Sequence, residues 1–215
     1  MAKSNDDLRD KLVTYLQDAY AMENEIADTL EKHAKDADGF PDIQNLIQRH
    51  LEETKQHRQR MEDRLNAYNE KPSSVKGAAT SVMGNVMGMM SGSRTDTLAK
   101  NTRDDYTTEH FEIAAYGLLI ATAQTYGDTA TIQACEMNLR DEVRMASLLE
   151  QQFPRVALIC LQQDHIDVPQ PMFQQTQSTW RQILDRIEQQ AGDVAQRATP
   201  PGQTAYETNP NGPTI

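Results

Sequence analysis

The sequence predicts an all-α protein, a bundle of four long helices with one long crossover connection. Strand signals are almost absent along its 215 residues. Four long segments instead repeat apolar residues every three or four positions, which is the period of a helix that buries one face. The connections between these segments are short, then long, then short. Short connections join antiparallel neighbours, so the long one carries the chain across the bundle.

The first two predicted helices form a hairpin. The first runs from about residue 6 to residue 34, and Asn5 or Asp6 can act as its N-cap. Its apolar stripe consists of Leu8, Leu12, Leu16, Ala19, Ile26 and Leu30. The stretch DADGFPD ends this helix and begins the second, where Pro41 fits the first turn because no backbone N–H is needed there. The second helix is expected to end near Tyr68.

Residues 69–97 are predicted to be the crossover. This stretch is rich in Gly, Ser and Met, and it is too long for a tight turn between antiparallel helices. A short helix is expected near residues 75–90. The methionines have two interpretations: they pack a connection onto the core, or they form a flexible interaction surface.

The other two long helices form a second hairpin. The third helix is expected over residues 97–126 and is followed by Gly127, a C-terminal helix signal. Asp128 or Thr129 then caps the fourth helix, which is expected to end near residue 152. Pro154 is predicted to open a separate short apolar helix, PRVALICLQQ.

The C-terminal part is predicted to lie outside the bundle. DVPQPMFQQTQ is interpreted as a linker, and residues 177–197 as an amphipathic helix. Its apolar side carries Trp180, Ile183, Ile187, Ala191 and Val194. The predicted organisation is a bundle over residues 1–165, a linker and helix over residues 166–197, and a disordered tail over residues 198–215, which are rich in Pro, Gly and Thr. A bundle with one long crossover between its second and third helices has ferritin-like connectivity.

The composition narrows the classes of function. The net charge is −11, from 21 basic and 32 acidic residues. Such a chain, without a basic stripe, binds nucleic acid poorly, because neutralising phosphates supplies most of that affinity. No window reaches the roughly 18 apolar residues of a membrane-spanning helix, and the N-terminal residues have no apolar signal-peptide region. Cys135 and Cys160 have no metal or disulfide spacing. We therefore expect a cytoplasmic protein with no nucleic-acid or membrane partner.

Acidic residues occupy stripe positions in three of the long helices. Glu23 stands where the first helix should present an apolar side chain, and Glu142 does so in the fourth. In the third helix, TTEHFEIAAYG brings Glu109 and Glu112 to the inner side, and His110 falls on its flank.

The second helix has a longer polar interruption. Between its two apolar parts, the inward positions are His50, then Glu53 or Thr54, then His57. The spacing of 50, 53 and 57 puts three side chains on one helix face. All four helices therefore present at least one carboxylate to the predicted core.

These carboxylates need a positive partner. Burying one unpaired carboxylate costs several kcal/mol or forces it to bind a proton, whereas a whole domain is stable by only about 5–15 kcal/mol. The inward stripes hold no lysine or arginine at these levels, and the nearest, Arg60 and Arg144, are expected at the periphery. Carboxylate oxygens with one or two imidazoles suit iron or manganese, with zinc as a further option.

The pattern approximates a dinuclear carboxylate site. In such bundles two helices each supply one Glu, and the other two each supply Glu-x-x-His. The match is incomplete, because Glu142 is followed at the third and fourth positions by Met145 and Ala146. The sequence therefore predicts two bound metal ions, with iron the first choice.

Four stretches resemble the YciE/YciF family of ferritin-like stress proteins. They are LQDAYAMENEI, HLEET, EHFEIAAYGLL and LRDEV, and the resemblance covers roughly residues 8–150. It implies a ferritin-like bundle, usually dimeric, with a dinuclear iron or manganese site. The implied site residues are Glu23, His50, Glu53, Glu109, His110, Glu112 and Glu142. The pair formed by Glu109 and Glu112 also resembles the third-helix pair of rubrerythrins.

Two positions depart from the family pattern. Ala146 stands where an acidic residue is common, and His57 stands where glutamine is common. One oxygen ligand is thereby lost and one nitrogen ligand gained. His57 and His110 are therefore expected either to bind metal or to hydrogen-bond to a metal ligand.

Two functions follow as hypotheses. In the first, the protein is a homodimer that binds two metal ions and is related to stress. O₂ or peroxide would react at these metal ions, in ferroxidase or peroxide-handling chemistry. Whether it is an enzyme stays open. In the second, it is a structural or interaction protein with a vestigial metal site. DNA protection, a third possibility, conflicts with the charge of −11.

Overall fold

The structure, a computed structural model, describes residues 5–72 and 96–198, which contain helices and no strand. The helices are α1 (Asn5–Asp36), α2 (Pro41–Ala67), α4 (Thr97–Tyr126), α5 (Thr129–Gln163) and α6 (Gln170–Ala198). The expected crossover helix near residues 75–90 and the expected disordered tail past residue 198 lie outside the described residues. None of the described helices is long and apolar enough to cross a membrane.

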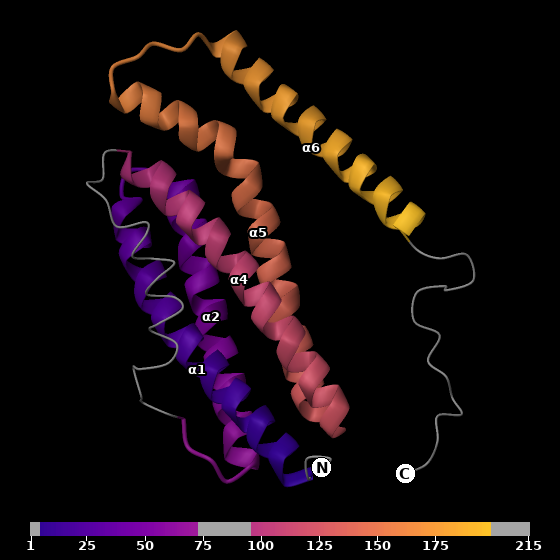
Figure 1. Ribbon diagram of the computed structural model, residues 1–215. Helices are drawn as coiled ribbons and strands as arrows, with labels where there is room; N and C mark the ends of the chain where they lie inside the picture. Colours follow the sequence, from indigo (N-terminus) through magenta and orange to yellow (C-terminus); the bar gives the residue numbers. More distant parts are fainter. Residues whose placement is uncertain (1–4, 73–95, 199–215) are drawn as a thin grey trace.

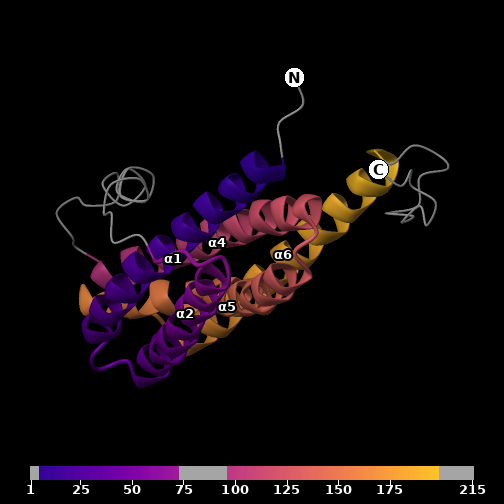
Figure 2. The same cartoon turned by 90° about the horizontal axis from the view of Figure 1, so that it is seen from below.

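Four of the helices form the predicted bundle. α1 packs against α2, and α4 packs against α5, as two antiparallel hairpins. The hairpins meet through α1 against α4 and α2 against α5 (Figures 1 and 2). α2 ends at one end of the bundle and α4 begins at the other (Figure 1), so the connection between them is the long crossover.

The bundle core is apolar at both ends and polar in the middle. Each of its helices buries at least one acidic or histidine side chain, with buried hydrophobic side chains before and after it along the helix. On α1, Leu16 precedes Glu23 and Leu30 follows it, and all three are buried. Hydrophobic burial at the two ends, worth about 1.5–3 kcal/mol for each large side chain, offsets the cost of the polar centre.

α4 has the least amphipathic sequence of the four bundle helices. Its inner face buries Asp105, Thr108, Glu109 and Glu112, whereas Leu118 on its outer side is 67% exposed. Ordinary surface helices show the opposite arrangement. The inner face of α4 is therefore specialised for polar contacts.

The junction between α4 and α5 confirms the predicted signals. Gly127 has φ 88°, a left-handed conformation that glycine adopts without a steric penalty. Asp128 is the N-cap of α5, and its Oδ1 accepts a hydrogen bond from the Thr131 backbone N–H at 3.0 Å. Burial raises the pKa of Asp128, but hydrogen bonds from Thr131 and Tyr68 outweigh it and bring the pKa to about 2.

The prediction that Pro154 opens a separate helix is wrong. α5 continues through it to Gln163, and it bends in its C-terminal part (Figure 1). Proline has no backbone N–H, so the carbonyl of Glu150 loses its usual helical partner. The Trp180 side chain of α6 supplies the replacement, because its Nε1–H donates to that carbonyl at 3.2 Å.

The predicted linker is also too long. α6 begins at Gln170, so part of DVPQPMFQQTQ is helical. The Pro169 carbonyl accepts hydrogen bonds from the backbone N–H groups of Met172 and Phe173, at 2.9 and 3.2 Å. Pro171 lies in the first turn, where a missing N–H costs little. α6 then packs against α5.

Candidate metal centre

Six buried side chains meet in the polar middle of the bundle. α1 contributes Glu23, α2 contributes His50 and His57, α4 contributes Glu109 and Glu112, and α5 contributes Glu142. Each is at most 1% exposed. All four bundle helices are needed to bring them together, because each contributes at least one.

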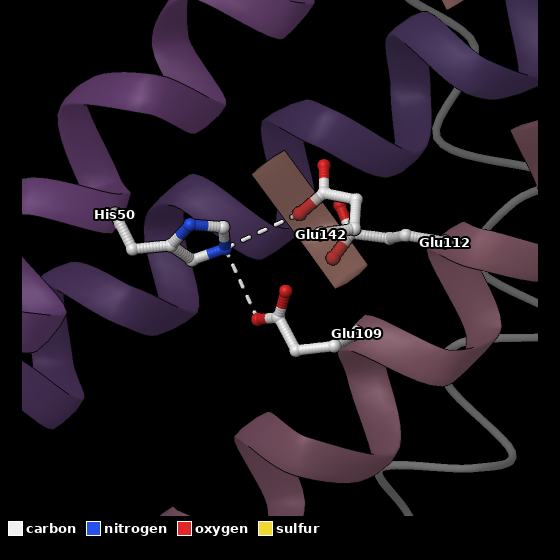
Figure 3. Close-up of side chains that lie close together, drawn as sticks. All are labelled: His50, Glu109, Glu112 and Glu142. Carbon is white, nitrogen blue, oxygen red and sulfur yellow. Dashed lines mark ion pairs between the residues drawn. The ribbon is translucent and has the colours of Figure 1, made fainter. Parts of the chain in front are cut away.

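The first group consists of His50, Glu109, Glu112 and Glu142, which point toward one another (Figure 3). His50 Nε2 lies 3.0 Å from Glu109 Oε1 and 3.5 Å from Glu142 Oε2. One ligand atom from each of the four residues lies within 4.8 Å of the others. A single cation could contact all four.

The second group consists of Glu23, His57 and Glu142. His57 Nδ1 lies 2.7 Å from Glu142 Oε1 and 3.8 Å from Glu23 Oε2. Glu142 therefore belongs to both groups, with one oxygen near each histidine. A carboxylate in this position could contact a cation in each group.

The atoms that converge in these groups are close but make no hydrogen bonds. The atoms without a hydrogen bond are Glu23 Oε2, His50 Nε2, His57 Nδ1 and both carboxylate oxygens of Glu109, Glu112 and Glu142. Buried polar atoms are normally paired, and an unpaired one costs roughly 1–3 kcal/mol. No lysine or arginine in the described part of the chain forms an ion pair with these four glutamates. The donor set fits a hard or borderline cation.

Burial changes the protonation of the carboxyl groups. It raises the pKa of Glu23 and of Glu109 to about 8, and it raises the pKa of Glu112 well above its usual range. Burial alone would lower the pKa of His50, but the carboxylates of Glu109 and Glu142 raise it well above its usual range. Without a cation, the centre therefore holds protons near neutral pH.

The outward nitrogen of each histidine contacts a carboxylate. Glu53 Oε2 lies 3.3 Å from His50 Nδ1, and Asp141 Oδ2 lies 3.1 Å from His57 Nε2. If each outward nitrogen donates its N–H there, His50 is left with a lone pair on Nε2 and His57 with one on Nδ1. These are the nitrogens that face the glutamates.

Tyr116 connects the second group to the bundle surface. Its hydroxyl donates a short hydrogen bond to Glu23 Oε1 and accepts one from Asn138 Nδ2 at 2.8 Å. Asn138 Oδ1 in turn accepts from Arg60 at 2.8 Å. This chain of hydrogen bonds fixes the orientation of the Glu23 carboxylate.

Two sequence-predicted site residues lie outside both groups. Glu53 is 32% exposed, whereas Thr54, the alternative inward position, is fully buried. His110 lies on the outer side of α4, where its ring centroid is 4.6 Å from that of Tyr106. Neighbouring helix positions differ by about 100°, so the pattern of α2 did not decide between 53 and 54.

The sequence analysis missed a further buried pair. His33 Nδ1 lies 2.5 Å from Asp105 Oδ1, and both side chains are buried between α1 and α4. Asp105 precedes Glu109 by four residues, so the inward stripe of α4 could have revealed it. His33 gave no comparable signal, because it lies near a helix end.

The family match covers the whole centre. Residues 7–159 match a family described as a domain of unknown function, DUF892. The chain belongs to the DUF892 family. The match includes every residue of the two ligand groups, and α6 lies beyond it.

Several solved structures are similar to this DUF892 chain. A protein from Xanthomonas campestris pv. campestris is 30% identical, with 74% of this chain and 99% of that chain covered and a TM-score of 0.64. The E. coli stress protein YciF is 22% identical, with coverages of 70% and 96% and a TM-score of 0.60.

A bacterioferritin from Desulfovibrio desulfuricans, crystallised to show its diiron site in different catalytic states, is 15% identical, with coverages of 74% and 87% and a TM-score of 0.60. At these identities, the bacterioferritin and YciF show the fold alone. The fold of this DUF892 chain is ferritin-like, which confirms the predicted fold class and the predicted family resemblance.

Proposed function

We propose that this protein binds two metal ions in the middle of its bundle, iron in the first place and manganese or zinc as alternatives. The observation that carries the proposal is the convergence around Glu142 of buried carboxylate and imidazole atoms that make no hydrogen bonds. One ion would be held by His50, Glu109, Glu112 and Glu142. The other would be held by Glu23, His57 and Glu142. The donors are mainly oxygen, with one imidazole for each ion, which suits iron and manganese.

The proposed chemistry is ferroxidase-type oxidation of Fe(II) or the handling of peroxide. Two redox-active metal ions about 3.5–4 Å apart can bind a small oxidant between them. The protein would shield the ions from bulk water, since the ligands are buried, and Tyr116 holds Glu23 in place. A role in stress, dimerisation and a cytoplasmic location belong to the same proposal. The stress role draws on the likeness to the E. coli stress protein YciF.

Metal content is the direct test. Purified protein loaded anaerobically with Fe(II) and desalted should contain about two ions per chain, the number in a two-metal site. Glu142→Ala should lower this number below one, because both ions lose their shared ligand. Glu136→Ala, on the exposed side of the same helix, should leave the number unchanged. Wild-type protein that retains no iron, manganese or zinc would contradict the proposal.

The reaction can be assigned by comparing oxidants. Anaerobic Fe(II)-loaded protein is mixed with O₂ in one experiment and with hydrogen peroxide in another, and the rates of Fe(II) oxidation and oxidant loss are measured. A peroxide-handling protein should react much faster with peroxide, whereas a ferroxidase should react readily with O₂. Rates equal to those of free Fe(II) would contradict both reactions.

A structural or interaction role is the second candidate. The second group contains three ligand residues, and Ala146, one turn after Glu142, places a buried methyl group where the family resemblance implies an acidic residue. In this case Glu142→Ala would leave the oligomeric state unchanged, as measured by light scattering, and the wild type would bind metal no better than the variant does.

A further inference from the structure

Arg144 joins the carboxylates that contact the two histidines. Its NH2 group lies 2.7 Å from Glu53 Oε1 and 3.0 Å from Asp141 Oδ1. Glu53 is on α2 and contacts His50, whereas Asp141 is on α5 and contacts His57. We call Arg144, Glu53 and Asp141 the Arg144 triad. It links the two helices and reaches both ligand groups.

The Arg144 triad lies between the buried centre and solvent. The Arg144 side chain is 51% exposed, Glu53 is 32% exposed and Asp141 is 22% exposed, whereas the two histidines are at most 1% exposed. A partly exposed carboxylate with no second partner is free to rotate toward water. Arg144 holds one oxygen of Glu53 and one of Asp141, so that the other oxygen of each stays on its histidine.

We propose that Arg144 is a positioning residue that orients both histidines at once through Glu53 and Asp141. His50 presents Nε2 to the centre and His57 presents Nδ1, so the two rings need opposite tautomers. A carboxylate beside the outer nitrogen selects the tautomer and fixes the ring angle. One surface arginine therefore controls the nitrogen ligand of each metal position. This inference rests on the proposed metal-binding function.

The expected pattern of affinities distinguishes this role from a merely structural one. Co²⁺ is titrated into metal-free protein, and the two binding steps are followed by visible absorption and calorimetry. Glu53→Gln should weaken mainly the ion at His50, and Asp141→Asn mainly the ion at His57. Arg144→Gln should weaken both, each by roughly 10- to 100-fold, the usual effect of losing such an outer partner. Adding Arg144→Gln to Glu53→Gln should weaken the His50 position little further.

Two further variants serve as controls. Arg140→Gln, on the exposed surface one turn earlier on α5, removes the same charge away from the Arg144 triad and should leave both affinities unchanged. Arg144→Lys restores the charge without the planar fork and should recover only part of the affinity. Arg144→Gln protein with the affinities of Arg140→Gln protein would overturn the inference. Wild-type protein that binds no metal would instead contradict the proposed function.

Discussion

Glu142 is the residue on which the two ligand groups depend. Its two oxygens face His50 and His57, and no other side chain belongs to both groups. A carboxylate buried without a cation is costly, so the metal-free centre reduces its charge by binding protons. Metal ions and protons therefore compete for the same atoms.

This competition predicts how the stability of the metal-free protein depends on pH. Glu23 and Glu109 have pKa values raised from 4.5 to about 8, so between these values the folded state binds protons that the unfolded state has lost. The pKa values of His50 and His57 are also raised, so above pH 6.5 these histidines too keep protons in the folded state that they lose in the unfolded state. Stability falls as pH rises when the folded state binds more protons. The Tm of metal-free protein, followed by circular dichroism, should therefore fall between pH 5 and pH 8.

The control for this prediction removes the raised carboxyl groups. Protein carrying both Glu23→Gln and Glu109→Gln should show a flatter profile over the same range. Groups with a lowered pKa do not interfere, because Asp128, with a pKa of about 2, loses its contribution only in more acidic solution. A metal-free Tm that is constant or rises from pH 5 to pH 8 would contradict the prediction.

Periodicity located most of the centre because each buried glutamate interrupts an apolar stripe. Periodicity failed where the orientation of a side chain depends on a partner residue from another helix. Position 53 or 54 of α2 could face inward by spacing alone, and the ion pair of Glu53 with Arg144 on α5 holds Glu53 at the surface. The burial of His33 is likewise explained by its contact with Asp105, which is 72 residues away in the sequence.

At the scale of the helices, α5 shows how a distant partner changes a local rule. Proline usually ends or bends a helix, which is why the sequence predicted a break at Pro154. The break is avoided because Trp180 satisfies the freed Glu150 carbonyl and Phe153 packs near its ring, with centroids 6.0 Å apart. The ends of α1, α2 and α4 follow local signals such as Gly127 and Pro41, so they could be predicted to within a few residues.

Pro154→Ala should weaken the contact between α5 and α6. The new backbone N–H can bond the Glu150 carbonyl within the helix, so Trp180 loses its acceptor and α5 can straighten. Trp180 is the one tryptophan of the chain, which makes its fluorescence a specific reporter. The emission maximum should shift to longer wavelength as the indole becomes more exposed to water.

Pro171→Ala is the matched control for this experiment. Pro171 lies in the first turn of α6, where a backbone N–H has no helical partner to bind. Its replacement should leave the tryptophan emission unchanged. An equal emission spectrum for Pro154→Ala protein and wild type would show that the Trp180 hydrogen bond does not depend on the proline.

At the scale of the whole molecule, the centre is a property of the docked hairpins. Each hairpin alone would hold only part of the ligand set, since α1 and α2 supply three residues and α4 and α5 supply the other three. Metal binding would therefore stabilise the packing of one hairpin against the other. A ligand present at about 1,000 times its Kd adds roughly 4 kcal/mol of stability.

The same reasoning predicts that residues 1–165 are sufficient for the centre. Every ligand residue and the whole Arg144 triad lie on α1, α2, α4 and α5, and α6 packs against α5 around Phe153 and Pro154. A protein ending at residue 165 should therefore retain the metal stoichiometry of the full chain. Its metal-free Tm should fall, because Phe153 and the Glu150 carbonyl become exposed. Loss of metal binding from a truncated protein that still shows the full-chain helical signal by circular dichroism would mean that α6 takes part in forming the centre.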